Sequence, residues 1–264
     1  MSRIDLKFRE LKKKGRRAFI AFITAGDPDL TATEQLVLSF ERAGVDIVEL
    51  GVPFSDPLAD GLTIQASSRR ALQKGITLEK IFKLVKKIRR KSEIPIALMT
   101  YYNPVFHYGE ERFITQAKQS GADGLIIPDL PPEEAKSLIQ SAAEKNISLV
   151  FFISPTTTQE RIKYIIRAST GFIYYVSLTG VTGTRKSLDS AISNQVRLVK
   201  RMTNKPICIG FGISNARQVR KASQIADGAI VGSAIVQQIF KNAGKKDLVK
   251  KAAKFVSRLS GGLK

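Results

Sequence analysis

The feature that most constrains the fold is a regular alternation of short β-branched runs with longer amphipathic stretches, repeated about eight times. The runs that predict strands are 18–24, 46–50, 95–100, 124–127, 148–153, 172–177, 206–210 and 229–231. The stretches with helical periodicity are 30–43, 76–91, 110–119, 132–145, 158–168, 191–202, 215–223 and 246–259. Strict β-then-α order predicts parallel strands with right-handed crossovers, and eight such units close into a barrel more readily than they form an open sheet.

We therefore expect a single-domain (β/α)8 TIM barrel over residues 1–264. The predicted strands are apolar on both faces, as in a buried parallel sheet, and no linker or low-complexity tract interrupts the chain. A doubly wound sheet is the alternative, but no Gly-x-Gly-x-x-Gly motif follows the first strand to form a dinucleotide cradle. Before that strand, Ile4, Phe8 and Leu11 repeat at helical spacing and predict an extra helix that caps one end of the barrel.

Composition argues against several other classes of protein. The chain is 43% hydrophobic, yet no apolar segment approaches the roughly 20 residues that span a bilayer. The N-terminal segment lacks the apolar core of a secretory signal, and the single cysteine, Cys208, excludes an internal disulfide framework. One histidine, His107, gives little support to a histidine-based metal site or triad. We expect a cytoplasmic protein without a metal or a membrane partner.

The formal net charge of +20 raises the alternative of nucleic-acid binding. However, the basic residues occupy the polar faces of several amphipathic segments. In 81–91, for example, Leu84, Val85 and Ile88 form an apolar stripe opposite the lysines and arginines. Because the charge is spread over many helices, we expect no nucleic-acid partner and only faster capture of an anionic substrate.

A glutamate interrupts the second predicted strand near its C-terminal end. Strand alternation places Glu49 on the same side as Ile47 and Gly51, in a largely apolar wall. Barrel chemistry lies at this end of the strands, and desolvation raises the pKa of a carboxyl group, so Glu49 is a candidate acid/base. A structural glutamate paired with a lysine or arginine explains the strand equally well.

The loop after this strand holds two aspartates, Asp56 and Asp60. Asp60 precedes Gly61 and a helix that begins near Thr63, which places it better for chemistry than Asp56. An aspartate before glycine is, by spacing alone, also typical of a turn.

Glycine-bearing loops follow the last three predicted strands and predict a phosphate site. Gly212 ends the seventh strand, and Gly232 with Ser233 opens a short helix, 234–240. Barrels often bind phosphate through these loops and the N-terminus of such an extra helix. The loop 178–184 after the sixth strand is long and has glycine hinges, as a lid has.

Six segments in order along nearly the whole chain resemble the tryptophan synthase alpha subunit family. They are Ala-Phe-Ile-Thr-Ala-Gly-Asp-Pro at 21–28, Glu-Leu-Gly-Val-Pro-Phe-Ser-Asp-Pro-Leu-Ala-Asp-Gly at 49–61, Met-Thr-Tyr-Tyr-Asn-Pro at 99–104, Gly-Val-Thr-Gly at 180–183, Gly-Phe-Gly-Ile-Ser at 210–214 and Gly-Ser-Ala-Ile-Val at 232–236. The segment 49–61 is highly specific, whereas other phosphate-binding barrels share looser forms of the late glycine motifs.

The resemblance implies retro-aldol cleavage of indole-3-glycerol phosphate to indole and glyceraldehyde 3-phosphate, without a metal or organic cofactor in this subunit. By this comparison, Glu49 protonates C3 of the indole and takes the proton of the glycerol hydroxyl. Asp60 accepts the indole N–H and stabilises the cationic ring. The implied partner is the beta subunit, a pyridoxal phosphate enzyme that receives indole through a tunnel in an α2β2 assembly.

The resemblance also implies two sets of binding residues. The residues around the substrate indole, with Thr182 as the lid residue that meets Asp60, are Phe22, Met99, Ile127, Ile153, Tyr174, Thr182 and Phe211. The phosphate site is implied at Gly183, Gly212, Gly232 and Ser233. We expect Glu49 to be fixed on its strand and the position of Asp60 to depend on Thr182 and the partner.

One residue departs from the family pattern, because Leu62 stands where the family usually has proline after Asp-Gly. Proline would preset the first helical turn, so the rigidity of the loop is in question. Two other functions stay open at this point: a stand-alone indole-3-glycerol phosphate lyase that releases free indole, and a phosphate-binding barrel without catalysis.

Overall fold

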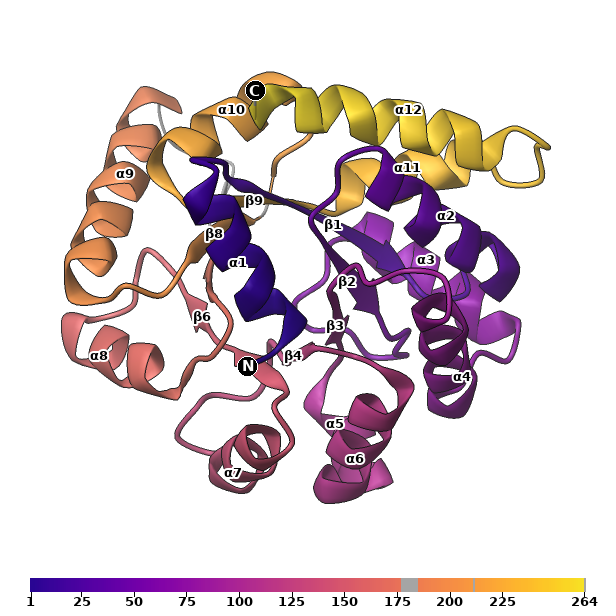
Figure 1. Ribbon diagram of the computed structural model, residues 1–264, viewed down its shortest axis with the longest axis horizontal. Helices are drawn as coiled ribbons and strands as arrows, with labels where there is room; N and C mark the ends of the chain where they lie inside the picture. Colours follow the sequence, from indigo (N-terminus) through magenta and orange to yellow (C-terminus); the bar gives the residue numbers. More distant parts are fainter. Residues whose placement is uncertain (177–184, 211, 264) are drawn as a thin grey trace.

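The computed structural model describes residues 1–176, 185–210 and 212–263, and its strands form the wall of a barrel (Figure 1). All strand pairs are parallel, in the order β5-β4-β3-β2-β1-β9-β8-β7-β6. The strands are β1 Ala18–Thr24, β2 Ile47–Gly51, β3 Ile96–Met99, β4 Gly124–Ile126, β5 Ser148–Val150, β6 Phe152–Ile153, β7 Ile173–Val176, β8 Ile207–Gly210 and β9 Gly228–Val231. The predicted TIM barrel is therefore confirmed.

One predicted strand is divided. The run 148–153 forms β5, which pairs with β4, and β6, which pairs with β7. Phe151 lies between them, and its carbonyl oxygen accepts a hydrogen bond from Tyr174 N at 3.0 Å. The expectation of one continuous strand was wrong because the stagger of a barrel makes the two ends of this run pair with different neighbours. The single stretch 148–153 thus closes the ring of described strands.

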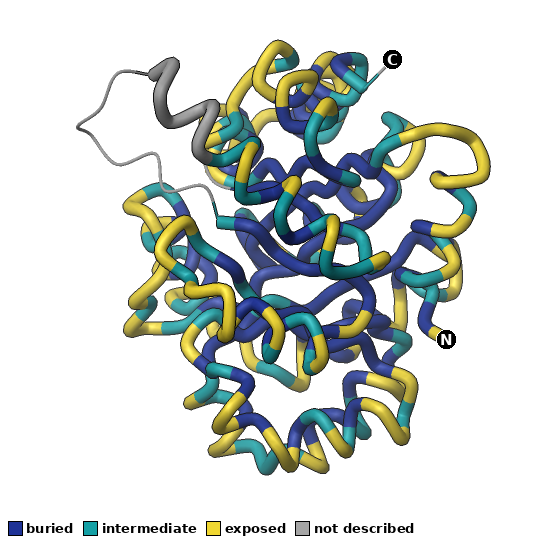
Figure 2. Tube along the Cα trace, turned by 90° about the vertical axis from the view of Figure 1, so that its left-hand side faces the viewer, coloured by how far each residue is buried: buried dark blue, intermediate teal, exposed yellow. Residues whose placement is uncertain are grey.

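Helices surround the barrel, and their inner faces are buried while their outer faces are exposed (Figure 2). They are α2 Leu30–Arg42, α3 Leu62–Gln73, α4 Leu78–Arg89, α5 Tyr102–Tyr108, α6 Glu110–Ser120, α7 Lys136–Glu144, α8 Gln159–Ala168, α9 Arg185–Met202, α10 Ala216–Ile225, α11 Ser233–Lys241 and α12 Leu248–Ser260. The short α5 was not predicted, and α7 begins four residues later than expected because residues 131–135 form a turn. None of the described helices is both long and apolar enough to cross a membrane.

The helix α1, Arg3–Lys13, lies across one end of the barrel, as predicted (Figure 1). Its buried residues Ile4, Phe8 and Leu11 pack with inward-facing strand residues. Two glycines make room for Ile4: a Cβ atom on Gly124 would lie 2.8 Å from Ile4 Cδ1, and one on Gly171 would lie 3.3 Å from Ile4 Cγ2. This packing fills the barrel interior at the N-terminal ends of the strands, so the opposite end is left for chemistry.

Removal of the N-cap of α1 gives a first test. Ser2 Oγ accepts a hydrogen bond from Asp5 N at 3.2 Å and lies 2.7 Å from Ser148 Oγ at the start of β5. We expect Ser2→Ala to lower the free energy of unfolding by about 1 kcal/mol, measured by urea titration. Ser223→Ala is the control, because the Ser223 hydroxyl donates to Arg220 O within its own helix. Equal stability of the Ser2→Ala variant and the unmodified chain would contradict the capping role.

Candidate active site

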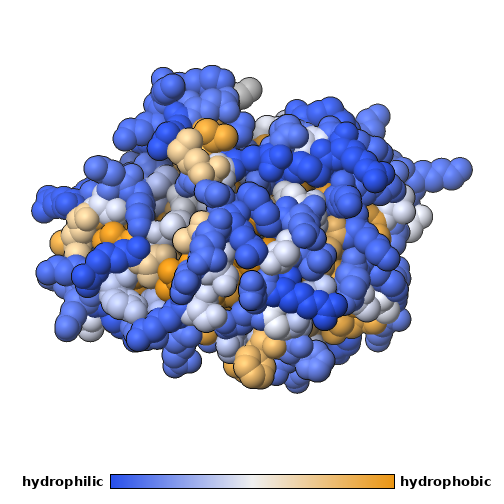
Figure 3. Space-filling model, turned by 60° about the horizontal axis from the view of Figure 1, so that its bottom comes forward, coloured by the Kyte–Doolittle hydropathy of each residue, from blue (hydrophilic) through white to orange (hydrophobic). Residues whose placement is uncertain are grey.

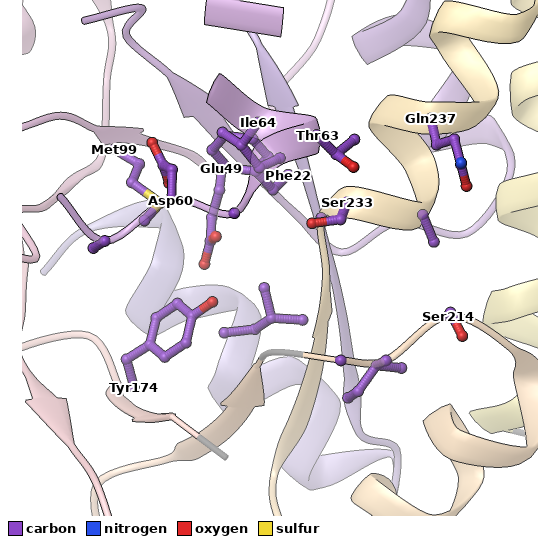
Figure 4. Close-up of a pocket in the computed structure, with 17 residues that line it drawn as sticks. Phe22, Glu49, Asp60, Thr63, Ile64, Met99, Tyr174, Ser214, Ser233 and Gln237 are labelled. Atoms are coloured by element: carbon purple, nitrogen blue, oxygen red, sulfur yellow. The ribbon is translucent and has the colours of Figure 1, made fainter. Parts of the chain in front are cut away.

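A cavity of about 320 Å³ opens at the C-terminal ends of the strands. Eight of the predicted site residues line it: Phe22, Glu49, Asp60, Met99, Tyr174, Gly212, Gly232 and Ser233 (Figure 4). The other lining residues, which the sequence did not single out for this site, are Ala59, Gly61, Thr63, Ile64, Ile213, Ser214, Ile230, Ala234 and Gln237. Residues from both halves of the chain thus meet around one space.

Glu49 is fully buried on β2, in register with Phe22 of β1 and Ala97 of β3. Among the described residues, neither of its carboxyl oxygens has a hydrogen-bond partner, so the ion-paired structural role is not supported. Burial raises the pKa of Glu49 to about 8 because the apolar wall disfavours the charged form. The carboxyl group therefore holds a proton at neutral pH and points into the cavity (Figure 4).

Asp60 is half-buried on the loop between β2 and α3. Burial raises the pKa of Asp60, and a hydrogen bond from Tyr101 partly offsets this shift. Two hydrogen bonds hold the backbone of the loop next to this side chain. Ala59 N donates to the Tyr101 hydroxyl at 3.0 Å, and Gln65 Nε2 donates to Asp60 O at 2.7 Å. Asp60 lines the same cavity as Glu49 but comes from a different element.

The other end of the cavity lies between two helix N-termini. The helix α11 begins at Ser233 with Gly232 as its N-cap, and α3 begins at Leu62 with Gly61 as its N-cap. The first N–H groups of a helix point out of its N-terminus, where they suit an anion. Thr63, Ser214 and Gln237 add polar side chains here (Figure 4). Sequence reasoning missed these three because their spacing alone does not bring them together.

The structure does not bring Ile127 and Ile153 to the cavity. Both are buried in the cluster between the sheet and the helices. Strand alternation explains this, because their neighbours Ile126 and Phe152 belong to the cluster inside the barrel. The predictions for Thr182, Gly183 and Phe211, and for the lid 178–184, lie outside the described residues.

The family model of the tryptophan synthase alpha chain matches residues 8–263 of this chain. The tryptophan synthase alpha chain of Thermoanaerobacter sp. (strain X514) is 50% identical over 259 residues, which are 98% of each chain. The alpha chain of Geotalea daltonii is 48% identical over 263 residues, 100% of this chain and 99% of its own.

Solved structures agree in fold over the whole length. Tryptophan synthase subunit alpha from Legionella pneumophila str. Paris is 34% identical with a TM-score of 0.92, covering 100% of this chain and 98% of that one. A chain of tryptophan synthase from M. tuberculosis, in its aminoacrylate-bound form, is 30% identical with a TM-score of 0.89, covering 100% of both chains. The chain therefore belongs to the tryptophan synthase alpha chain family, the lyases that cleave indole-3-glycerol phosphate in tryptophan biosynthesis.

Proposed function

We propose that Glu49 and Asp60 carry out the cleavage of indole-3-glycerol phosphate in this chain. The observation that carries the proposal is Glu49 itself, a buried carboxyl group without a partner among the described residues and with a pKa of about 8. Such a group gives and takes a proton near neutral pH. Asp60 lines the same cavity as Glu49, so one bound substrate can contact both carboxyl groups.

Glu49 and Asp60 together supply every proton transfer and charge interaction that the proposed reaction needs. Glu49 gives its proton to C3 of the indole, which makes the ring cationic, and Asp60 accepts the indole N–H and stabilises that charge. The carboxylate of Glu49 then takes the proton of the hydroxyl on the glycerol carbon that is attached to indole C3. The bond between indole C3 and this carbon breaks, and its electron pair returns to the ring. The products are indole and glyceraldehyde 3-phosphate.

The remaining lining residues suit the two ends of the substrate. Phe22, Met99 and Tyr174 supply apolar surface near the carboxyl groups for an indole, with Ile64 and Ile230 beside them. We assign the phosphate to Gly212, Gly232 and Ser233, where α11 presents its N-terminus. Glycine at these positions lets backbone N–H groups approach phosphate oxygens.

Members of this family need no cofactor, and pyridoxal phosphate belongs to the beta chain of tryptophan synthase. We further propose that this chain works in the cytoplasm in an α2β2 assembly and passes indole to that beta chain. Exposed apolar side chains near the cavity support a partner there: Leu58 and Leu62 are 87% and 84% exposed beside the lining residues 59–61. If a beta chain does not accelerate the reaction, the stand-alone lyase is the better description.

We propose no nucleic-acid partner for this chain. On the face seen in Figure 3, hydrophilic side chains are spread over the whole surface with small separate apolar patches. Duplex DNA affinity below micromolar at physiological salt would overturn this view.

Asp60→Asn tests the second carboxyl group. The amide keeps the shape but loses the charge that stabilises the cationic ring, so we expect kcat to fall about 10- to 100-fold. Steady-state release of indole measures the effect. Asp56→Asn, on the exposed part of the same loop, is the control and should keep normal turnover in the isolated chain. Normal turnover of the Asp60→Asn variant would remove Asp60 from the mechanism.

A further inference from the structure

One side chain contacts both ends of the loop that carries Asp60. The ring of Tyr101 packs against Phe54 at the start of the loop, with centroids 5.4 Å apart and planes 30° apart. At the other end, the hydroxyl of Tyr101 accepts the hydrogen bond from Ala59 N at 3.0 Å. Between these contacts, Ser55, Asp56 and Leu58 are exposed. The loop is therefore held at its two ends by the same residue.

Tyr101 is itself fixed by the barrel. It directly follows the C-terminal end of β3, and its side chain is 4% exposed. On one side, Thr100 N donates to Ile126 O of β4 at 3.0 Å, and on the other, Tyr102 N donates to Asp129 Oδ1 at 2.9 Å. Because its backbone is tied on both sides, Tyr101 presents its hydroxyl from a rigid wall rather than from a second loop.

The hydrogen-bond chemistry of a phenol sets the direction of this contact. A backbone N–H only donates, so the Tyr101 oxygen must be the acceptor for Ala59. Its own hydrogen is then available for a second partner, and the interaction of this hydroxyl with the carboxyl group of Asp60 lowers the pKa of Asp60. One hydroxyl thus contacts the backbone before Asp60 and lies beside the carboxyl group of Asp60.

We propose that Tyr101 is the positioning residue of Asp60 and holds this carboxylate toward the cavity before any partner chain binds. The proposal rests on the function proposed for Asp60 and goes beyond it, because it names what places that group. It also adds Tyr101 to Thr182 and the partner, on which the position of Asp60 is expected to depend.

The surroundings of Asp60 make this hydrogen bond consequential. The titratable groups that face Asp60 are Tyr101 after β3, Glu49 on β2 and Tyr174 on β7, with Asp129 near Tyr101. No lysine or arginine is among the described residues that line the cavity. The described lining residues therefore offer no cation to favour the ionised form of Asp60, and the neutral phenol of Tyr101 is the donor that favours it.

The test is Tyr101→Phe, with Tyr102→Phe as the matched control. Tyr102 also uses its hydroxyl, but on Glu110 Oε1 at 2.8 Å, away from the cavity. We expect Tyr101→Phe to lower kcat about tenfold, with KM changed less than about threefold, because the lost contact acts on the charge that develops in the transition state. Tyr102→Phe should leave both constants unchanged.

Two further measurements separate positioning from a general loss of structure. Without the phenol donor the pKa of Asp60 rises, so the acidic limb of the kcat/KM profile should move to higher pH, a shift that does not depend on how much enzyme is folded. In the Asp60→Asn background, Tyr101→Phe should have no additional effect on kcat.

Each outcome decides a different claim. An unshifted acidic limb, or a full additional loss in the Asp60→Asn background, would overturn the role of Tyr101 and leave the proposed function standing. If Asp60→Asn itself has normal kcat, the function proposed for Asp60 fails first, and the proposal for Tyr101 fails with it.

Discussion

Replacing Glu49 by glutamine is expected to slow the release of indole from indole-3-glycerol phosphate by about 10²–10⁴, the usual contribution of a positioned acid/base. The amide has nearly the same shape but neither gives nor takes the proton. Because the glutamine fills the same buried space as Glu49, the fold and the phosphate end of the cavity should be unchanged. Steady-state kinetics measures the loss, and binding of indole-3-propanol phosphate, followed by calorimetry, should be retained.

Glu34→Gln is the matched control for this prediction. Glu34 is also buried, but it lies on α2 outside the cavity and forms ion pairs with Lys87 at 2.7 Å and Lys91 at 2.8 Å. The folded fraction of this variant should turn over at the normal rate. A Glu49→Gln enzyme with near-normal kcat would rule out Glu49 as the acid/base.

The same substitution should change how stability depends on pH. The pKa of Glu49 is about 8 in the folded chain and 4.5 as an ordinary glutamate, so between these values the folded state holds the extra proton. The carboxyl group thus contributes stability that is fully present below pH 4.5 and is lost as pH rises to about 8. By linkage, about 1.4 kcal/mol is lost per pH unit in this window.

Glu49→Gln removes this dependence. The difference in unfolding free energy between the variant and the unmodified chain should therefore change with pH. From pH 5 to pH 8 it should shift by on the order of 3 kcal/mol in favour of the variant. Urea titrations at pH 5, 6.5 and 8 measure the difference. Glu144→Gln, at an exposed site, should stay within about 0.5 kcal/mol at each pH. A pH-independent difference between Glu49→Gln and the unmodified chain would mean that Glu49 keeps an ordinary pKa.

The barrel was predictable because its signals are local. Each strand run is apolar and each helix has a periodic apolar face, so the order of elements and the two extra helices α1 and α11 follow from the sequence. The break at Phe151 was not predictable in this way, since it depends on which neighbours the two ends of one run meet. The faces to which Ile127 and Ile153 belong were not predictable for a related reason, because they depend on where each strand starts its alternation.

The site was predictable in part. Glu49 and Asp60 were predicted from the sequence as candidate carboxyl groups, and both line the cavity, but the strand pattern explained an ion-paired Glu49 as well as an acid/base. Only the packed structure shows that no described residue pairs with it. Tyr101 could not be singled out from the sequence, because an aromatic residue after a strand carries no distinctive pattern and its contact with Ala59 spans 42 residues.

The cleavage reaction is tested by giving the purified chain indole-3-glycerol phosphate and measuring the products with and without a tryptophan synthase beta chain. We expect indole and glyceraldehyde 3-phosphate in equal amounts, formed by the chain alone and faster when the beta chain is added. Absence of indole under both conditions, with the chain folded and the substrate intact, would contradict the proposed function.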